Sequence, residues 1–270
     1  SSKEDVYSLA ETVPENAEKI LDILCPGPIT IILNKSNLVP DVVTAGGTTV
    51  AIRFPENEIA RELIKKSAAP SANLSGRPSP TTAAHVAEDL SDKIDYIIDG
   101  GPCRVGLEST VIDLTVTPPR ILRPGGVSQE TLAALLGEVT GYAPRDEDTT
   151  SPKSPGMKYK HYAPKAKITI LDADSREFTE YVNSQKKEGL FALCFEEDVP
   201  FLQVPYISLG KDETDQAKHL FAALRELDER GAQEVYARCP SKQGVGLAVY
   251  NRLIRAAAYQ EHTLDGESEA

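Results

Sequence analysis

Apolar residues recur at helical spacing in several parts of the first half of the chain. Four of them at i, i+3, i+4 and i+7 predict an amphipathic helix over 14–24, which Pro26 ends. Ser79 as an N-cap and Pro80 at the first helical position predict the start of another helix, and Gly137 is a typical helix stop. Three further helices are therefore expected over 59–66, 81–90 and 128–136.

Short apolar runs between these helices predict β-strands. The expected strands cover residues 29–33, 49–54, 94–98, 109–114 and 120–122. Because side chains alternate along a strand, Thr49, Ala51 and Arg53 share one face of the segment TVAIRF, and the apolar residues share the other. Arg53 is therefore expected on a sheet face rather than on a free loop.

The second half of the chain alternates strands with helices. Residues 142–164 are rich in Pro, Asp, Ser, Lys and Gly and predict an interdomain linker. After it, strands are expected over 167–171, 190–195, 204–209 and 234–239, with helices over 176–187, 214–230 and 247–257. This alternation predicts a small doubly wound α/β domain with a mostly parallel sheet.

Composition narrows the class of protein. Hydrophobic residues make up 40% of the 270-residue chain, enough for a packed core, and the net charge of −12 disfavours stable binding to nucleic acid. The four cysteines form no CxxC pair, which favours reduced thiols in a cytoplasmic protein over a structural zinc site. No apolar run is long enough for a membrane span, and the first residues do not form a signal peptide.

Several catalytic motifs are nearly matched and then fail. GPCRVGLEST has the glycine spacing of a phosphate-binding loop, but Leu107 stands where that motif requires lysine. GVGLAV begins like a dinucleotide fingerprint, but Val249 stands where the third small residue belongs. The chain has no GxSxG, no HExxH and only four histidines, so neither a serine-hydrolase triad nor a protein-held metal site is predicted.

Five segments carry candidate chemistry, although each could also be ordinary turn, strand-end or linker sequence. Arg53 could present its planar guanidinium to a carboxylate or phosphate. Ser71, Asn73 and Ser79 surround Gly76 in APSANLSGRPSPTT, a loop before a helix that could bind an anion. The other three are GLESTVIDL with Ser109, ILRPGG with Arg123, and the basic, aromatic SPGMKYKHYAP, a possible flap over a ligand.

In this order, the motifs resemble one family. PGPITIIL, TVAIRFP, APSANLSGRPSPT, DGGPCRVGLESTVIDL, ILRPGG and SPGMKYKHYAP look like the YrdC-like threonylcarbamoyl-AMP synthases, in their longer two-domain form. The resemblance implies an α/β fold with a twisted-sheet YrdC-like catalytic domain over 1–141, a linker and active-site flap over 142–165, and a Rossmann-like domain over 166–260. Family members begin with a segment containing PTETVYGL and a KxR pair, so we expect this chain to lack that N-terminal segment.

The resemblance also implies an activity. Such an enzyme condenses L-threonine, bicarbonate or CO2 and ATP, with Mg²⁺, to threonylcarbamoyl-AMP and pyrophosphate, and supplies the product to a transferase that modifies tRNA. The implied catalytic residues are Arg53 and Arg123. The implied ATP contacts are Thr49, Ser71, Asn73, Ser79, Arg123, Lys158, Tyr159 and His161, and the implied threonine contacts are Arg53, Ala69 and Ser109.

Two other functions are compatible with the sequence. A carbamoyltransferase that forms carbamoyl-AMP can use a YrdC-like domain, and fold alone does not separate it from a threonylcarbamoyl-AMP synthase. A non-catalytic RNA-binding module could use the same cavity, although the charge of −12 argues against it. Carbamoyl phosphate as a substrate would indicate the first, and RNA affinity that falls steeply with salt would indicate the second.

Overall fold

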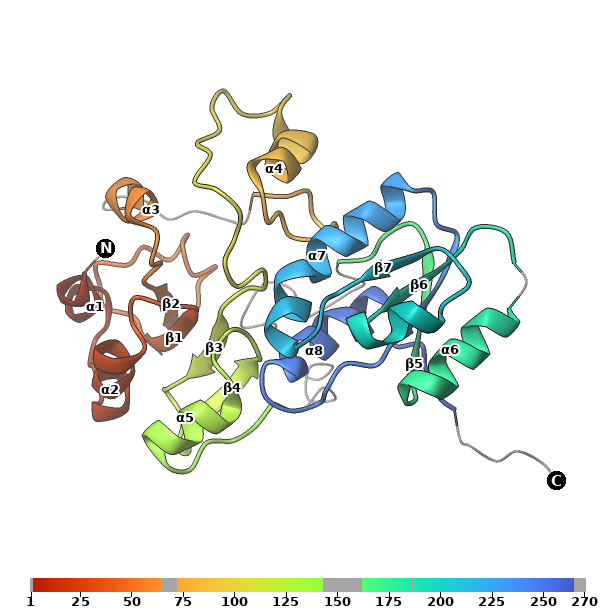
Figure 1. Cartoon of the computed structure of the whole chain (residues 1–270). Helices are drawn as coiled ribbons and strands as arrows, with labels where there is room; N and C mark the ends of the chain where they lie inside the picture. The colour runs from red at the N-terminus through yellow and green to blue at the C-terminus, as the bar shows by residue number, and fades with distance from the viewer. Residues whose placement is uncertain (1, 65–71, 143–161, 186, 265–270) are drawn as a thin grey trace. The chain divides into compact units, whose positions relative to one another are not determined.

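The structure is a computed structural model that describes residues 2–64, 72–142, 162–185 and 187–264 (Figure 1). The chain forms two compact units. The first contains Ser1–Pro70 and Glu108–Asp146, and the second contains Ser71–Leu107 and Glu147–Ala270. The second unit therefore combines the serine-rich segment with the C-terminal half of the chain. The domain boundaries 1–141, 142–165 and 166–260 stay a prediction.

The first unit is built around a four-stranded mixed sheet. Its elements are α1 (Lys3–Leu9), α2 (Glu15–Ile23), β1 (Ile29–Asn34), β2 (Thr49–Arg53), α3 (Glu58–Leu63), β3 (Thr110–Asp113), β4 (Arg120–Arg123) and α5 (Gln129–Leu136). The strand order is β2-β1-β3-β4, with β1 and β3 parallel and the two outer pairs antiparallel. Helix α5 starts at the predicted N-cap Ser128 and ends at the predicted stop Gly137.

One face of this sheet forms the core of the first unit. Ile31 stands opposite Ile52 on β2 and opposite Ile112 on β3, and these side chains are 8% exposed or less. Helices α1, α2 and α5 cover this face with Val6, Ile20 and Leu132 among others. Because alternate residues of a strand point to opposite faces, Thr30 and Asn34 of β1 and Thr49 and Arg53 of β2 lie on the other face.

The second unit contains a five-stranded parallel sheet with helices on both faces. Its elements are α4 (Ala83–Leu90), β5 (Lys167–Asp172), α6 (Ser175–Ser184), β6 (Leu190–Cys194), η3 (Glu196–Phe201), β7 (Tyr206–Ser208), α7 (Glu213–Glu229), β8 (Glu234–Arg238), α8 (Gly246–Ala256) and β9 (Glu261–Thr263). The strand order is β7-β6-β8-β5-β9. Apolar residues of α7 and α8 pack on one face and those of α6 on the other. The predicted doubly wound parallel fold is confirmed.

The structure corrects two local predictions in the second unit. Residues 94–98 form no strand, and Ile94, Tyr96, Ile97 and Ile98 are 38% to 88% exposed. A strand requires a neighbour for its backbone groups, and among the described residues no strand pairs with this segment. The N-cap of α4 is Thr82, whose side chain accepts the amide of His85, and not Ser79. Pro80 therefore does not occupy the first helical position.

Three elements were not expected from the sequence. Helix α1, the 3-10 helix η3 and strand β9 are all short, which leaves little periodicity to detect. The four cysteines, all within the described ranges, are free. None of the helices in the described part of the chain has both the length and the apolarity that a membrane span requires.

Candidate active site

The strand register places the two predicted arginines on one face of the four-stranded sheet. Thr30 on β1 stands opposite Arg53 on β2 and opposite Val111 on β3, and Val111 stands opposite Arg123 on β4. Directly opposed residues in a sheet share a face. Thr49 stands opposite Asn34, four residues from Thr30, and so lies on the same face. The predicted common face of Thr49 and Arg53 is confirmed.

Ser109 is the centre of a compact polar cluster on this face. The Nε and Nη2 atoms of Arg123 donate to the carbonyl oxygen of Ser109 at 3.2 and 3.0 Å, and Nη2 also reaches its Oγ at 3.3 Å. The Ser109 Oγ lies 2.6 Å from Oγ1 of Thr30. Ser109 is 3% exposed, so its hydroxyl is held in one place by Arg123 and Thr30.

A β-bulge turns Arg123 toward Ser109. Val111 pairs with Arg123, but the next residue, Ile112, pairs with Ile121. One extra residue on β4, Leu122, therefore stands between the two pairs, and a bulge of this kind re-aims the following side chain. As a result Ile121 stays in the core at 3% exposure, whereas Arg123 reaches the opposite face.

The Gly-Gly turn after Arg123 is held directly against the start of β3. The hydroxyl of the fully buried Thr110 donates to the carbonyl of Val127 at 2.6 Å and accepts the Val127 amide at 3.0 Å. A Cβ on Gly125 would lie 2.3 Å from the nitrogen of Thr110 and 2.4 Å from the carbonyl carbon of Ser109. Only glycine permits this approach, so Gly125 sets the spacing between β3 and the Arg123 backbone.

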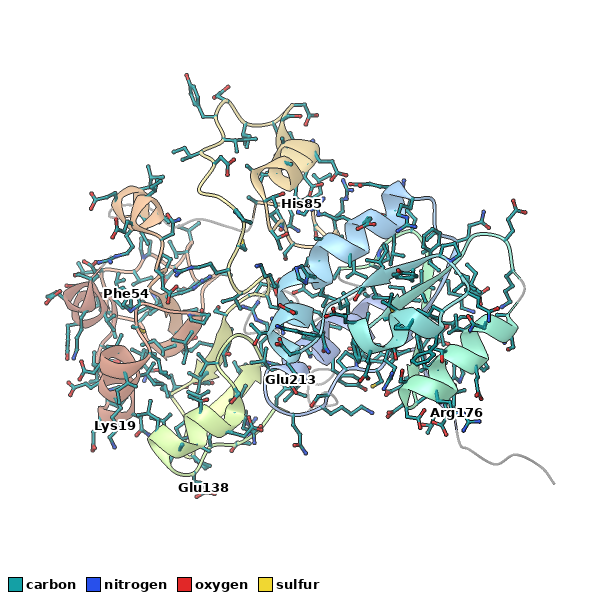
Figure 2. The ribbon with its side chains drawn as sticks, viewed as in Figure 1. Lys19, Phe54, His85, Glu138, Arg176 and Glu213 are labelled. Atoms are coloured by element: carbon teal, nitrogen blue, oxygen red, sulfur yellow. The ribbon has the colours of Figure 1, made fainter. Side chains whose placement is uncertain are left out.

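Arg53 closes the same face at the end of β2. Arg53 is exposed, whereas the next residue, Phe54, is only 7% exposed and belongs to the core of the unit (Figure 2). Thr49, at the other end of β2, is half-buried. A guanidinium that is anchored at the end of a strand can bind a carboxylate or phosphate with two parallel hydrogen bonds. The face therefore offers two cationic groups and several hydroxyls to an anionic ligand.

The other predicted site residues fall elsewhere. Asn73 and Ser79 lie in the second unit, in the serine-rich loop (residues 72–82) that precedes α4. Because α4 is capped by Thr82, Ser79 lies three residues before the cap, and the predicted anion-binding role of the loop stays a prediction. Ala69, Ser71, Lys158, Tyr159 and His161 lie outside the described residues.

His85 on α4 gives the loop a pH-dependent stability. Its Nδ1 accepts the amide of Thr81 at 3.2 Å, and burial, followed by the positive charge of Arg225, lowers the pKa of His85 from its ordinary value of 6.5. The unfolded chain therefore binds this proton at a higher pH than the folded chain does. We expect the free energy of unfolding to be fully present above about pH 6.5 and to fall as the pH drops from there toward the folded-state pKa. Urea denaturation at a series of pH values measures this slope.

The matched comparison uses two glutamine variants. His85→Gln removes the titrating group and should flatten the slope in the window below about pH 6.5. His262→Gln, on the exposed edge of β9, should keep the wild-type slope. Equal slopes in the wild type and His85→Gln would contradict the assignment.

Metal-ligand geometry occurs in the described residues at one place, in the second unit. Asp172 ends β5, Cys239 follows β8 and Glu261 begins β9, and their ligand atoms lie within 4.8 Å of one another. The ammonium of Lys242 already pairs with both carboxylates at 2.9 Å. A metal ion would have to displace this lysine, so the group fits a partly exposed ion-pair cluster better than a metal site.

Comparison with known proteins places the whole chain in one family. A family model described as "Telomere recombination" (Sua5_yciO_yrdC) matches residues 1–125, and one described as "Threonylcarbamoyl-AMP synthase, C-terminal domain" (Sua5_C) matches residues 127–258. The chain belongs to the Sua5-type family of two-domain threonylcarbamoyl-AMP synthases. The resemblance inferred from the motifs is thereby confirmed.

Similar members of the Sua5-type family come from archaea and bacteria. A threonylcarbamoyl-AMP synthase of Pyrococcus abyssi is 43% identical over 96% of this chain and 79% of its own length. A Bacillus subtilis threonylcarbamoyl-AMP synthase is 39% identical over 92% of this chain and 75% of its own length. The crystal structure of P. abyssi Sua5 complexed with L-threonine superposes with a TM-score of 0.88, at 41% identity, over 98% of this chain and 80% of that one.

Two residues of the cluster were not predicted from the sequence. Thr30 lies in the motif PGPITIIL, where it is the single polar residue of an apolar run. A polar residue in such a run is the sequence feature that could have identified Thr30 as part of the site. Gly125 belongs to ILRPGG, but its close contact with β3 depends on a pairing between distant segments that the sequence does not reveal. Both act on Ser109, either through a hydrogen bond or through backbone spacing.

Proposed function

We infer that the chain catalyses the formation of threonylcarbamoyl-AMP from L-threonine, bicarbonate or CO2 and ATP. The chain is a threonylcarbamoyl-AMP synthase, with relatives of that name matched along nearly its whole length. The observation that supports a site for this reaction is the common sheet face of Arg53, Ser109 and Arg123. Two guanidinium groups there suit two anionic substrates.

Arg53 and Ser109 are proposed to bind L-threonine. The exposed Arg53 is proposed to hold the carboxylate through its planar fork. The Ser109 hydroxyl, fixed by Thr30 and Arg123, is proposed to contact the amino acid beside it. Ala69 is a further proposed contact from the sequence. The related P. abyssi protein has been crystallised with L-threonine, which supports this substrate.

The ATP side of the site is proposed to use Arg123 with the hydroxyl-rich segments. Arg123 lies at the end of β4 with one edge of its guanidinium engaged by Ser109. Its positive charge would stabilise charge that develops on the α-phosphate. Thr49, Ser71, Asn73, Ser79, Lys158, Tyr159 and His161 complete the proposed ATP contacts.

The proposed reaction has two steps and no covalent enzyme intermediate. The amine of threonine adds to CO2 and loses a proton to give N-carboxy-threonine. A carboxylate oxygen of this carbamate then attacks the α-phosphorus of ATP, the bond to the β-phosphate oxygen breaks, and pyrophosphate leaves. The protein contributes mainly by positioning and by charge stabilisation at Arg123.

Magnesium is proposed to enter with ATP rather than through a site held by the protein. Mg²⁺ keeps several waters and often binds substrate phosphates with few protein carboxylates. Among the described strand residues of the arginine-bearing face, the carboxylate is that of Asp113. It is buried and accepts hydrogen bonds from the amide and the hydroxyl of Thr115. The face does not offer a carboxylate cluster in its described part.

The proposed downstream partner is a tRNA-modifying transferase, and the proposed location is the cytoplasm.

Threonine-dependent release of pyrophosphate tests the function. The purified full-length protein is supplied with ATP, bicarbonate and labelled threonine, and pyrophosphate and the labelled adenylate are measured. We expect both products in equal amounts only when all three substrates are present. Pyrophosphate release that needs carbamoyl phosphate and ignores threonine would instead indicate a carbamoyltransferase.

Within the same assay, Arg53→Ala separates the threonine contact from the ATP contact. Loss of one bidentate carboxylate contact should raise KM for threonine by about 30-fold while KM for ATP changes little. Arg61→Ala on α3 is the control, since it removes an arginine of the same unit outside the proposed site. Unchanged threonine kinetics in Arg53→Ala would remove Arg53 from the site.

A further inference from the structure

Helix α7 of the second unit carries an arginine buried among charged partners. The Arg225 side chain is 1% exposed and the Asp89 side chain is fully buried. Nη2 of Arg225 lies 2.7 Å from Oδ2 of Asp89, and Nη1 lies 3.2 Å from Oδ1, so the contact is bidentate. Charged groups are rarely buried unless they are paired, and such a pair joins its two elements in one fixed geometry.

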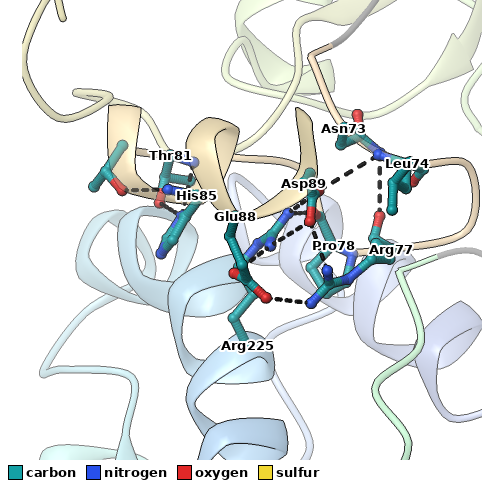
Figure 3. A network of polar contacts seen from close by, with 10 residues as sticks. Asn73, Leu74, Arg77, Pro78, Thr81, His85, Glu88, Asp89 and Arg225 are labelled. Atoms are coloured by element: carbon teal, nitrogen blue, oxygen red, sulfur yellow. Dashed lines mark hydrogen bonds and ion pairs between the residues drawn. The ribbon is translucent and has the colours of Figure 1, made fainter. Parts of the chain in front are cut away.

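This pair also holds the serine-rich loop (Figure 3). Nη2 of Arg225 donates to the carbonyl of Pro78 at 2.6 Å, and Asp89 accepts a hydrogen bond from Arg77 at 2.7 Å and the amide of Leu74 at 3.4 Å. Three contacts thus connect the loop to the ion pair at positions 74, 77 and 78. The loop conformation therefore depends on a residue almost 150 positions further along the chain.

The charges in this network balance. Arg77 and Arg225 carry two positive charges, and Glu88 and Asp89 carry two negative ones, with Glu88 bridging the two arginines at 2.6 and 3.0 Å. Burial alone would raise the pKa of Asp89, but the hydrogen bond and charge of Arg225 together with the charge of Arg77 outweigh it and lower that pKa. Asp89 is therefore ionised at neutral pH and available to both arginines.

The anchored positions flank two of the proposed ATP contacts. Ser79 directly follows Pro78, whose carbonyl Arg225 holds. The side-chain amide of Asn73 donates to the carbonyls of Leu74 and Arg77 at 3.0 and 3.3 Å, and its buried Oδ1 accepts no hydrogen bond from the described residues. A buried amide oxygen without a partner is costly, and a ligand N–H could satisfy it.

We propose that Arg225 is a positioning residue for the ATP contacts of the serine-rich loop. Through its contacts with Asp89 and Pro78, it holds Asn73 and Ser79 in the geometry that binds the nucleotide. The inference rests on the proposed function for the identity of the ligand. It gives the C-terminal part of the chain a role in the reaction, because α7 lies within residues 127–258, which the family model of the C-terminal domain matches.

Arg225→Lys is the direct test, because it keeps the charge but loses the planar fork. Lysine cannot contact both oxygens of Asp89 and the carbonyl of Pro78 in the same way. KM for ATP should rise about tenfold while KM for threonine stays within about twofold, because the displaced groups belong to the ATP side. Hydrogen exchange of residues 72–82, measured without substrates, should become faster.

Arg238→Lys is the matched control. Arg238 is 11% exposed in its side chain and pairs with the fully buried Asp198. Its contacts with Glu197, with the carbonyl of Ala173 and with the rings of Phe178 and Phe195 also lie away from the loop. We expect this variant to lower the unfolding temperature as Arg225→Lys does, with wild-type KM for ATP and wild-type exchange in the loop. Equal kinetics in the two variants would reduce Arg225 to a structural role and overturn the proposal.

A double-mutant cycle with Asp89→Asn tests whether the pair acts as one unit. If Arg225 acts through Asp89, the double variant should have a KM for ATP no higher than that of the worse single variant. Effects that multiply would mean that the two residues act separately, against the proposal. If the wild type releases no pyrophosphate with threonine, the proposed function fails, whereas faster exchange confined to Arg225→Lys would still support positioning of the loop.

Discussion

Arg123→Ala is expected to lower kcat/KM for ATP by about 100-fold or more, the usual range for the loss of one preorganised charge-stabilising donor. The guanidinium is fixed by two hydrogen bonds to the carbonyl of Ser109, and little reorganisation is needed when charge develops on the phosphate. Initial rates of pyrophosphate release at several ATP concentrations measure the change. Arg123→Lys should recover only part of the rate, because lysine cannot bridge Ser109 and the phosphate with a planar fork.

Arg120→Ala is the control for this prediction. Arg120 lies on the same strand, is exposed, and stands opposite Asp113. Its loss should leave kcat/KM for ATP within about twofold of the wild type, as expected for a surface substitution. If both variants lost the same activity, general damage to β4 would account for it. If Arg123→Ala kept wild-type rates while remaining folded, Arg123 would have no part in catalysis.

The sequence predicts the elements of the site better than their arrangement. Alternation in TVAIRF was sufficient to place Thr49 and Arg53 on one face, because the two-residue period of a strand is a local property. Local capping chemistry also identified Ser128 and Gly137 correctly at the ends of α5. The parallel sheet of the second unit followed from the alternation of strands and helices, which is visible along the chain.

Properties that depend on pairing between distant segments could not be predicted in this way. A simple alternation would put Arg123 on the same face as Ile121, and only the bulge opposite Ile112 separates them. The segment 94–98 has strand-like residues, yet a strand forms only where a neighbour is available. Ser79 and Thr82 are both good N-caps, and the choice of Thr82 depends on the fixed loop before α4.

The contact of Arg225 with the serine-rich loop has the same origin. The stripe of apolar residues on α7 was predicted, and Leu220, Leu224 and Leu227 are all fully buried. An arginine next to this stripe would ordinarily be assigned to its solvent-exposed edge. Its burial becomes clear only when Asp89 and Pro78, more than 130 residues away in the sequence, are placed beside it.

Gly125→Ala is expected to lower both the stability and the activity of the protein. The added Cβ would lie 2.3 to 2.5 Å from backbone atoms of Thr110, Ser109 and Glu108, which cannot move as a flexible side chain can. Relief of this overlap must separate the Gly-Gly turn from β3, at a cost of about 3 kcal/mol in the free energy of unfolding. Urea denaturation measures this loss.

The same movement shifts Arg123 away from Ser109, so kcat/KM for both ATP and threonine should fall by about 100-fold in the fraction that remains folded. Gly47→Ala is the control, because its added Cβ would meet only the carbonyl oxygen of Thr44, at 3.0 Å, in an exposed loop. It should cost less than about 1 kcal/mol and leave the kinetics unchanged. A Gly125→Ala variant with full activity would show that the spacing between β3 and the turn does not determine how Ser109 and Arg123 meet the substrates.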